Sequence, residues 1–276
     1  KQLIFTYAEK SQLIIKVLDN NNKYASHALN KGIFHAKGDV IIRMDAHAFF
    51  PENYVINCVN VLKETNADNV GGLIDTLGAT YVGNIFAKVL STKFGVGNSQ
   101  FRVGKDSGYV DTVPFGCFKK STFKKFGNFD TRLIRNQDYE FNQRIIKGGG
   151  KIYLDARIRS SYFCRDSLIG VTKYGFQNGK WNIKTSRILP NTMSLRHYIP
   201  MAFLIFVISS FFIIFFSRVL LIISTIIMTF YFSLASINSV KKTSNLFSFF
   251  VMIFIYLIFH LSYGFGSIIA LFEESP

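Results

Sequence analysis

The sequence divides at about Tyr198 into a charged part and an almost wholly apolar part. Three apolar stretches follow one another in the second part, at about 200–217, 219–237 and 246–272. A helix needs about 20 apolar residues to cross the hydrocarbon core of a bilayer, so each stretch is long enough, or nearly so, to be a transmembrane helix. Only Arg218 separates the first two stretches. They therefore predict either two crossing helices or a re-entrant hairpin.

The charged part is strongly basic, because the chain has a formal charge of +15 at pH 7 and few of its charged residues lie in the apolar part. Basic surfaces bind nucleic acids, anionic lipids or phosphorylated ligands. No zinc-finger, helix-turn-helix or aromatic RNA-binding pattern accompanies the charge, so we expect no nucleic-acid partner. Basic segments stay on the cytoplasmic side of a membrane. We therefore expect a multi-pass protein of the inner (plasma) membrane with this part in the cytoplasm.

Helical and strand-like patterns alternate along the first part. Helices are expected at 1–10, 24–36, 54–62, 81–94, 136–147 and 168–188, and strands at 13–18, 40–42, 69–73, 109–114, 151–154 and 158–163, with a loop at 95–108. Such alternation is typical of a parallel sheet covered by helices. The sequence therefore predicts an α/β fold with a mostly parallel sheet and flanking helices, followed by a C-terminal transmembrane helical region.

One stretch, residues 38–51 (GDVIIRMDAHAFFP), leads from an apolar run straight into Asp45-Ala46-His47. In open α/β sheets, ligands lie beyond the carboxyl ends of the strands. Asp45 and His47 are two residues apart, so on an extended chain they project in the same direction. A carboxylate and an imidazole placed in this way can hold a divalent cation, and the cation can hold a diphosphate. The alternative is a strand that simply ends in a polar turn.

Three further stretches carry polar residues in patterns that have both a functional and a structural interpretation. Residues 110–116 (VDTVPFG) predict a strand that runs into a glycine turn, where a backbone can approach a ligand closely. Asp138 stands at the start of a helix, where an acid also interacts favourably with the helix dipole. Residues 177–181 (QNGKW) lie on a helix that could equally be an amphipathic surface segment with an interfacial tryptophan.

His260 lies inside the third apolar stretch. An ionisable residue within a membrane segment is a functional candidate. The alternative is a helix-packing surface that His260 shares with Ser262, Tyr263 and Gly264.

Taken together and in this order, these stretches resemble the family 2 glycosyltransferases of the GT-A fold. The likeness is greatest to the membrane enzymes that build succinoglycan-type exopolysaccharides and capsules. Asp45-Ala46-His47 is similar to the Asp-x-Asp metal motif, with His in the second place, and Asn136-Gln137-Asp138 resembles the motif whose Asp is the catalytic base. Residues 177–181 are similar to the Gln-x-x-Arg-Trp motif, with Lys in place of Arg.

The resemblance runs from about Asn30 to the end of the chain. It implies a GT-A-like (Rossmann-like) catalytic domain over 1–190, followed over 191–276 by an interfacial segment and the transmembrane helices. Family members begin with a strand and turn that bind the nucleotide base, and nothing here matches that part. We therefore expect the catalytic domain to lack its N-terminal nucleotide-binding portion.

The resemblance also implies a reaction, in which a sugar passes with inversion from a nucleotide-diphosphate sugar to a lipid-linked (polyprenyl-diphosphate) saccharide. Asp138 would be the catalytic base. Asn30, Asp45 and His47 would bind the donor diphosphate, with Asp45 and His47 holding a divalent cation, Mn²⁺ or Mg²⁺. The acceptor side would be lined by Gly116, Gln137, Gln177, Lys180 and Trp181.

Two other functions fit the same features. One is a transferase that makes a polyprenyl-phosphate sugar, which would share the fold and the metal site. The other is a truncated, non-catalytic transferase that acts as a membrane scaffold. A transporter is disfavoured, because three spans do not offer paired halves around a midplane site.

Overall fold

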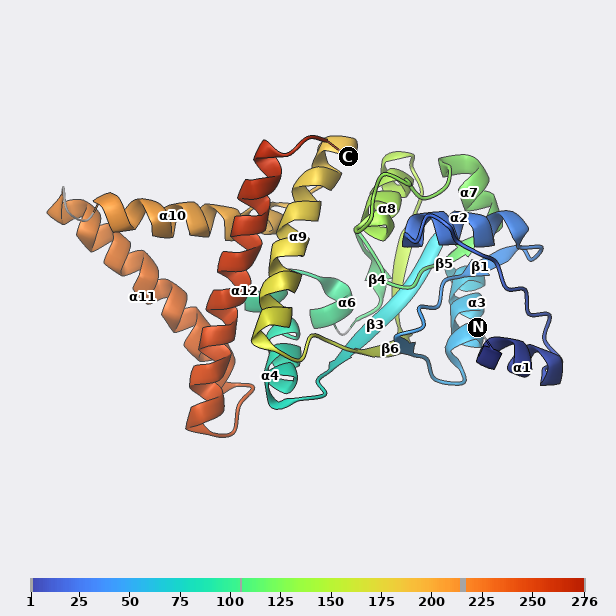
Figure 1. Ribbon diagram of the computed structural model, residues 1–276, viewed down its shortest axis with the longest axis horizontal. Helices are drawn as coiled ribbons and strands as arrows, with labels where there is room; N and C mark the ends of the chain where they lie inside the picture. Colours follow the sequence, from blue (N-terminus) through green and yellow to red (C-terminus); the bar gives the residue numbers. More distant parts are fainter. Residues whose placement is uncertain (1, 105, 214–216, 276) are drawn as a thin grey trace.

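The computed structural model describes residues 2–104, 106–213 and 217–275. Residues 214–216, which belong to the first expected span, lie outside the described residues. The same is true of Lys1 and Pro276, at the two ends of the expected domains. A sheet flanked by helices forms one side of the molecule, and long apolar helices form the other (Figure 1). A cavity lies between these two sides of the molecule.

The sheet is mixed. Its strands are β1 Val40–Ile42, β2 Ala48–Phe49, β3 Asn69–Leu77, β4 Gly108–Tyr109, β5 Cys117–Lys119 and β6 Ile152–Phe163, in the order β1-β5-β3-β6-β2, with β4 also paired to β6. Among the described residues only β3 and β6 pair in parallel, and the other pairs are antiparallel. The expectation of a mostly parallel sheet is therefore wrong, although β1, β3 and β6 do run in one direction. The other strands, β2, β4 and β5, are antiparallel to their neighbours. Each has too few residues to show the alternation of apolar and polar residues that identifies a strand in the sequence.

Several predicted strands differ in the structure. Residues 13–18 lie within the described chain and form no strand, and the side chains of Leu13 and Ile14 are 71% and 102% exposed. An apolar run becomes a strand only where a neighbouring strand pairs with its backbone. Of the strand expected at 109–114 only Tyr109 is paired, and the loop expected at 95–108 contains the short helix α6 Gln100–Val103. The strands expected at 151–154 and 158–163 are one strand, β6, which bulges between Asp155 and Arg159.

Five helices accompany the sheet: α1 Gln2–Lys10, α2 Ala25–His35, α3 Tyr54–Thr65, α7 Lys120–Phe126 and α8 Gln137–Lys147. Helices α1, α2, α3 and α8 confirm the helices predicted at 1–10, 24–36, 54–62 and 136–147. Two apolar clusters hold α2, α3, α7 and α8 in place. One surrounds Phe141 of α8, whose ring stacks on Phe123 of α7, and the other packs α3 against β3 and β5 through Cys58 and Cys117.

The remaining helices form the apolar side of the molecule. They are α4 Tyr81–Leu90, α5 Lys93–Val96, α9 Leu168–Ile188, the 3-10 turn η1 Leu195–His197, α10 Ile199–Ile213, α11 Arg218–Val240 and α12 Leu246–Phe272. By length and composition, α11 and α12 could each cross a membrane, whereas α10 is a shorter apolar helix within the described residues. Two of the three expected spans therefore meet the length of a crossing helix, whereas the described part of the first is shorter.

Helix α9 follows β6 in the chain and packs along much of α12 (Figure 1). Glycines allow this close approach. A Cβ at Gly179 would lie 1.9 Å from the carbonyl oxygen of Tyr263, and one at Gly175 would lie 2.2 Å from Ser262 Oγ. At the far end of the contact, Glu273 binds the ammonium groups of Lys180 at 2.5 Å and Lys184 at 2.8 Å.

Candidate active site

A cavity of about 810 Å³ lies between the edge of the sheet and the apolar helices. Charged side chains from the end of β1 and the start of α8 line one end of it, among them Asp45 and Asp138. Aromatic and aliphatic side chains of α10, α11 and α12, such as Phe203, Leu234 and Phe259, line the other end. The cavity is large enough for a small-molecule ligand and has both charged and apolar walls.

At the polar end, Arg43 links the two acids that the sequence singled out. Its guanidinium donates two hydrogen bonds to Asp45, from Nε to Oδ1 at 2.8 Å and from Nη2 to Oδ2 at 2.7 Å. Its Nη1 lies 3.9 Å from Asp138 Oδ2 and, within the described chain, has no hydrogen-bond partner although it is buried. Burial lowers the pKa of Arg43, but the bond to Asp45 and the attraction of Asp138 outweigh this and raise it.

Arg43 and Asp45 reach the cavity because they follow directly after β1, which ends at Ile42. The backbone N–H of Arg43 donates to the carbonyl oxygen of Gly116 at 3.1 Å, which ties the end of β1 to the turn before β5. A Cβ at Gly116 would lie 2.5 Å from Asn69 Oδ1 and from the ring of Phe118. Gly116 thus positions the end of β1, and the described cavity wall does not include it.

Asp138 lies in the first turn of α8, and the chain enters this helix through Asn136 in the left-handed conformation, with φ 61°. Asp138 Oδ1 accepts a hydrogen bond from the backbone N–H of Tyr139 at 2.9 Å. The side chain of Asp138 is 43% exposed and lines the cavity, as do its neighbours Asn136, Gln137 and Tyr139. The predicted base and Gln137 therefore stand where a ligand can reach them.

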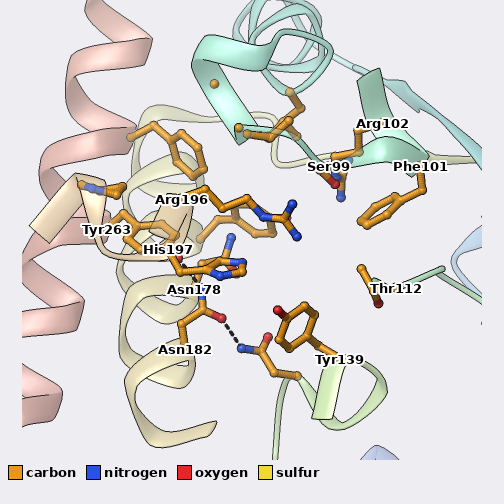
Figure 2. A pocket seen from close by; sticks show the side chains of 18 of the residues that line it. Ser99, Phe101, Arg102, Thr112, Tyr139, Asn178, Asn182, Arg196, His197 and Tyr263 are labelled. Carbon is orange, nitrogen blue, oxygen red and sulfur yellow. Dashed lines mark hydrogen bonds between the residues drawn. The ribbon is translucent and has the colours of Figure 1, made fainter. Parts of the chain in front are cut away.

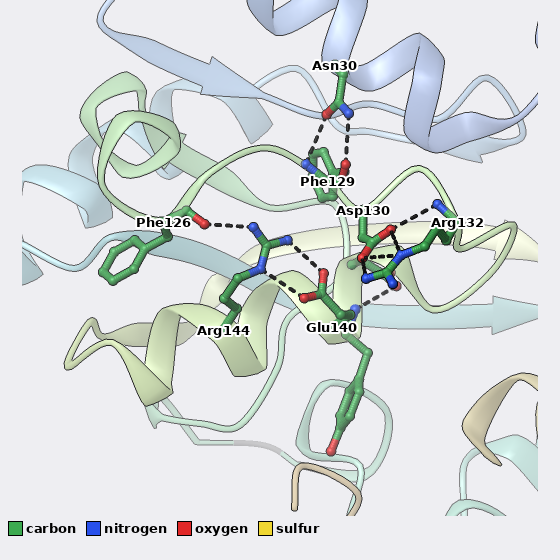
Figure 3. A network of polar contacts seen from close by, with 9 residues as sticks. Asn30, Phe126, Phe129, Asp130, Arg132, Glu140 and Arg144 are labelled. Carbon is green, nitrogen blue, oxygen red and sulfur yellow. Dashed lines mark hydrogen bonds and ion pairs between the residues drawn. The ribbon is translucent and has the colours of Figure 1, made fainter. Parts of the chain in front are cut away.

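A buried ion pair holds α8 in place one turn after Asp138 (Figure 3). Glu140 is 3% exposed and accepts two hydrogen bonds from Arg144, at 2.9 and 2.8 Å. Arg144 also donates to the carbonyl oxygen of Phe126 at 2.7 Å. The pair therefore connects α8 to the end of α7.

Asn30 belongs to the same support rather than to the cavity wall (Figure 3). Its amide donates to the carbonyl oxygen of Phe129 at 2.8 Å and accepts from the backbone N–H of Phe129 at 2.9 Å. Both polar atoms of the Asn30 side chain are therefore engaged in tying α2 to the segment that leads into α8. This arrangement assigns Asn30 a structural role, in place of the predicted contact with the donor.

Helix α9 turns a different face to the cavity from the one that the sequence indicated. Tyr174, Asn178 and Asn182, spaced four residues apart, line the cavity (Figure 2). The predicted acceptor residues Gln177, Lys180 and Trp181 are absent from the described wall. Trp181 Nε1 donates to Gln177 Oε1 at 3.2 Å, and Lys180 binds Glu273. Residues 177–181 thus anchor α9. Counting one helical turn in each direction from Asn178 could have identified Tyr174 and Asn182 as the residues that face the cavity.

The segment before α10 supplies two residues that sequence reasoning missed (Figure 2). Arg196 donates to Asp111 Oδ2 at 2.6 Å and to the carbonyl oxygen of Asn98 at 2.9 Å. His197 lines the cavity beside the ring of Tyr139, and its buried Nδ1 has no hydrogen-bond partner in the described part of the chain. Burial, aided by the neighbouring Arg196, lowers the pKa of His197 to about 4.

Polar contacts also link the start of α8 to α12 through α9. Asn136 donates from its amide to Asn182, and Asn182 donates in turn to the hydroxyl of Tyr263. All three side chains line the cavity. The position of Asp138 is therefore coupled to the apolar helices by direct contacts.

The donor set for a divalent cation is small but chemically suitable. Asp45 and His47 both line the cavity, and the described residues contain no group of three or more metal-ligating side chains. Mg²⁺ is commonly held by one or two carboxylates together with the phosphates of its substrate, and Mn²⁺ accepts carboxylate and imidazole ligands. The two residues therefore fit a cation that shares its coordination with a bound diphosphate.

Comparison with known proteins finds similarity to glycosyltransferases. Residues 1–121 match the family model "Glycosyl transferase family 2". Over 160 residues the chain is 32% identical to a dolichyl N-acetyl-alpha-D-glucosaminyl phosphate 3-beta-D-2,3-diacetamido-2,3-dideoxy-beta-D-glucuronosyltransferase of Methanococcus voltae, which covers 56% of this chain and 50% of that protein. Over 190 residues it is 27% identical to the succinoglycan biosynthesis protein ExoA of Rhizobium meliloti (strain 1021), covering 67% and 57%.

Among solved structures, the mannosyltransferase PcManGT of Pyrobaculum calidifontis, in complex with GDP-Man and Mn²⁺, matches with a TM-score of 0.62 at 12% identity, covering 98% of this chain and 74% of that one. A match at this identity is one of fold. The chain spans about half the length of the curated relatives it matches. The similarity to family 2 glycosyltransferases thus lies in residues 1–121, and the fold of the chain is GT-A-like.

Proposed function

We propose that the chain transfers a sugar, with inversion, from a nucleotide-diphosphate sugar to a hydroxyl group of a lipid-linked saccharide. One observation carries the proposal: a single cavity has Asp45 and Asp138 at one end and apolar side chains such as Phe203 and Phe259 at the other. A lipid-linked saccharide has the same two parts, a polar sugar and a long apolar chain. Such an acceptor complements both ends of the cavity at once.

The names of the relatives support both substrates. One relative is named for a dolichyl-linked sugar phosphate and another for succinoglycan synthesis, and the similar solved structure contains GDP-Man and Mn²⁺. The apolar helices α11 and α12 support attachment of this chain to a membrane. A catalytic domain attached in this way meets a lipid-linked acceptor at the membrane surface.

For the donor, Asp45 and His47 would hold Mn²⁺ or Mg²⁺. When bound, the cation offsets the negative charge that builds on the leaving diphosphate. Each oxygen of Asp45 has two acceptor positions, so the contact with Arg43 leaves room for a second partner. Arg43 keeps the Asp45 carboxylate in one orientation, and its unpartnered Nη1 is available to a phosphate oxygen.

For the acceptor, Asp138 would take the proton of the attacking hydroxyl group. The oxygen forms a bond to the anomeric carbon while the bond from that carbon to the diphosphate oxygen breaks. Gln137 lines the cavity and its buried Oε1 has no hydrogen-bond partner in the described chain, so a sugar hydroxyl group would supply the missing bond.

The direct test supplies the full chain in membranes with labelled nucleotide sugars and a lipid extract, with Mn²⁺ or with EDTA. We expect label to enter the lipid fraction with Mn²⁺ and with one or a few donors only. A water-soluble labelled product alone would contradict the lipid-linked acceptor. Donor binding without transfer to any acceptor would favour the non-catalytic scaffold.

A further inference from the structure

The cavity contains more positive charge than the donor site uses. Among the described residues, its wall has five lysine and arginine side chains (Arg43, Lys93, Arg102, Arg135 and Arg196) and two carboxylates (Asp45 and Asp138). Arg43 is occupied by Asp45, and Arg196 by Asp111. Arg102 and Arg135 form no ion pair within the described chain, although each is partly buried. A buried charge without a partner is costly, so these two guanidinium groups are poised for an anion.

Both guanidinium groups lie against aromatic rings. The Arg102 guanidinium carbon is 5.4 Å from the ring centres of Phe101 and Tyr162, and its Nη1 donates to Thr76 Oγ1 at 3.0 Å. The Arg135 guanidinium carbon is 5.7 Å from the ring centre of Tyr174. Ring contacts fix the plane of a guanidinium while its edge N–H groups stay free for bidentate bonds to phosphate.

Tyr174, whose ring Arg135 contacts, lines the cavity together with both arginines. Burial lowers the pKa of Arg135, and the attraction of the nearby Asp138 does not offset this effect. The charge of Arg135 is thus only weakly compensated within the protein.

The same ring marks the boundary with the apolar helices. Tyr174 stacks on Phe259 of α12, with ring centres 6.1 Å apart, and Phe259 lines the apolar end of the cavity. Figure 2 shows Arg102 and Arg196 reaching into the cavity from different elements. An anion held by Arg102 and Arg135 would therefore sit where the polar wall meets the apolar wall.

We propose that Arg102 and Arg135, which line this cavity together with Tyr174, form a second anion site that binds the phosphoryl or diphosphate group of an amphiphile whose apolar chain extends toward α10, α11 and α12. The inference rests on the proposed function, because it assigns the lipid-linked acceptor its phosphate contacts. An inorganic phosphate or diphosphate shares the anionic group but not the apolar chain. The amphiphile should therefore bind much more tightly than the free anion.

The test uses the full chain in a non-ionic detergent and three matched probes: farnesyl diphosphate, farnesol and inorganic diphosphate. Calorimetry should give an affinity for farnesyl diphosphate at least about tenfold tighter than for either of the other two. Arg102→Gln and Arg135→Gln should each weaken farnesyl diphosphate binding by roughly tenfold, the loss expected for a charge-assisted hydrogen bond. Arg135→Lys keeps the charge without the planar fork and should lose less.

Arg132→Gln is the matched control, because Arg132 is exposed, is paired with Asp130 and lies outside the described cavity wall. It should leave farnesyl diphosphate binding unchanged. Thermal midpoints report whether each variant is folded, and where one Gln variant is unstable the other Gln variant and Arg135→Lys decide. Unchanged farnesyl diphosphate affinity in the folded Gln variants would overturn the site. Equal binding of farnesol, or of inorganic diphosphate, by the parent would do the same.

The proposed function is tested separately on the parent chain by Mn²⁺-dependent binding of nucleotide sugars. Loss of that result would contradict the transferase proposal and leave the farnesyl diphosphate result standing. Conversely, donor binding with no specific effect of Arg102→Gln or Arg135→Gln would remove the second anion site alone.

Discussion

Arg43 donates two hydrogen bonds to Asp45, at 2.8 and 2.7 Å, and so holds this carboxylate at the polar end of the cavity. The same guanidinium lies 3.9 Å from Asp138. Arg43, the residue that follows β1, therefore sets the relation between the candidate metal ligand and the candidate base, which come from parts of the chain far apart in sequence.

Asp45→Asn removes a negative ligand while keeping the size of the side chain. We expect the dissociation constant of the nucleotide sugar, measured by calorimetry in Mn²⁺, to rise by roughly tenfold or more, because metal sites lose this much even from changes next to a ligand. Asp75→Asn is the control, since Asp75 is exposed and paired with Arg159 outside the described cavity wall. Equal Mn²⁺ dependence in parent and Asp45→Asn would contradict the assigned ligand.

Arg144→Gln leaves the buried carboxylate of Glu140 without its ion-pair partner. Breaking a buried pair by removing one partner costs about 3–5 kcal/mol, so the thermal midpoint should fall clearly. Adding Glu140→Gln to this variant should restore part of the loss. Arg132→Gln, which breaks an exposed pair, should cost about 1 kcal/mol or less. A midpoint in Arg144→Gln as high as in Arg132→Gln would show that the Glu140–Arg144 pair does not support α8.

Gly179→Ala tests the contact between α9 and α12. Its Cβ would lie 1.9 Å from the carbonyl oxygen of Tyr263, so the helices must separate, and overpacking of this kind costs about 1–3 kcal/mol. Gly32→Ala in α2 is the matched control, because nothing lies within 4 Å of its added Cβ. That change should leave the thermal midpoint equal or slightly higher, since alanine favours a helix over glycine by about 1 kcal/mol. Equal midpoints for the two variants would refute the close packing.

The pH dependence of stability should report the buried His197. Its pKa is about 4 in the folded chain against an ordinary value of 6.5, so the folded state binds fewer protons than the unfolded state between these values. Stability is therefore fully present above about pH 6.5 and declines as the pH falls toward 4. His197→Gln should lose less thermal stability than the parent between pH 7 and pH 5. An equal loss of thermal stability in His197→Gln and in the parent would show that His197 does not cause the pH dependence.

Much of the architecture could be predicted from local patterns. The helical spacing of α2, α3, α8 and α9 follows from apolar faces that each helix buries, and the apolar run of β1 leads to Asp45 as expected. Asp45, His47, Gln137 and Asp138 do line one cavity. Asp45 and His47 come soon after β1, and Gln137 and Asp138 begin α8. Because the ends of these elements can be recognised in the sequence, the sequence sufficed to single out these residues.

Other features depend on partners that a local pattern does not identify. Residues 13–18 have the composition of a strand but no described strand pairs with them, and β5 runs antiparallel between β1 and β3. Trp181 and Lys180 match a motif, yet the close packing of Gly179 on α12 turns them away from the cavity. Arg43 was overlooked because its importance comes from its contacts with two acids, one of them distant in sequence.

The measurement that tests the account most directly compares sugar transfer with donor binding in Asp138→Asn and Asp75→Asn. Asp138→Asn should bind Mn²⁺ and nucleotide sugar like the parent but transfer sugar roughly 10²-fold more slowly or worse, as expected when a positioned general base is removed. Asp75→Asn should match the parent in both measurements. Transfer by Asp138→Asn at the parent rate would contradict the assignment of Asp138 as the base.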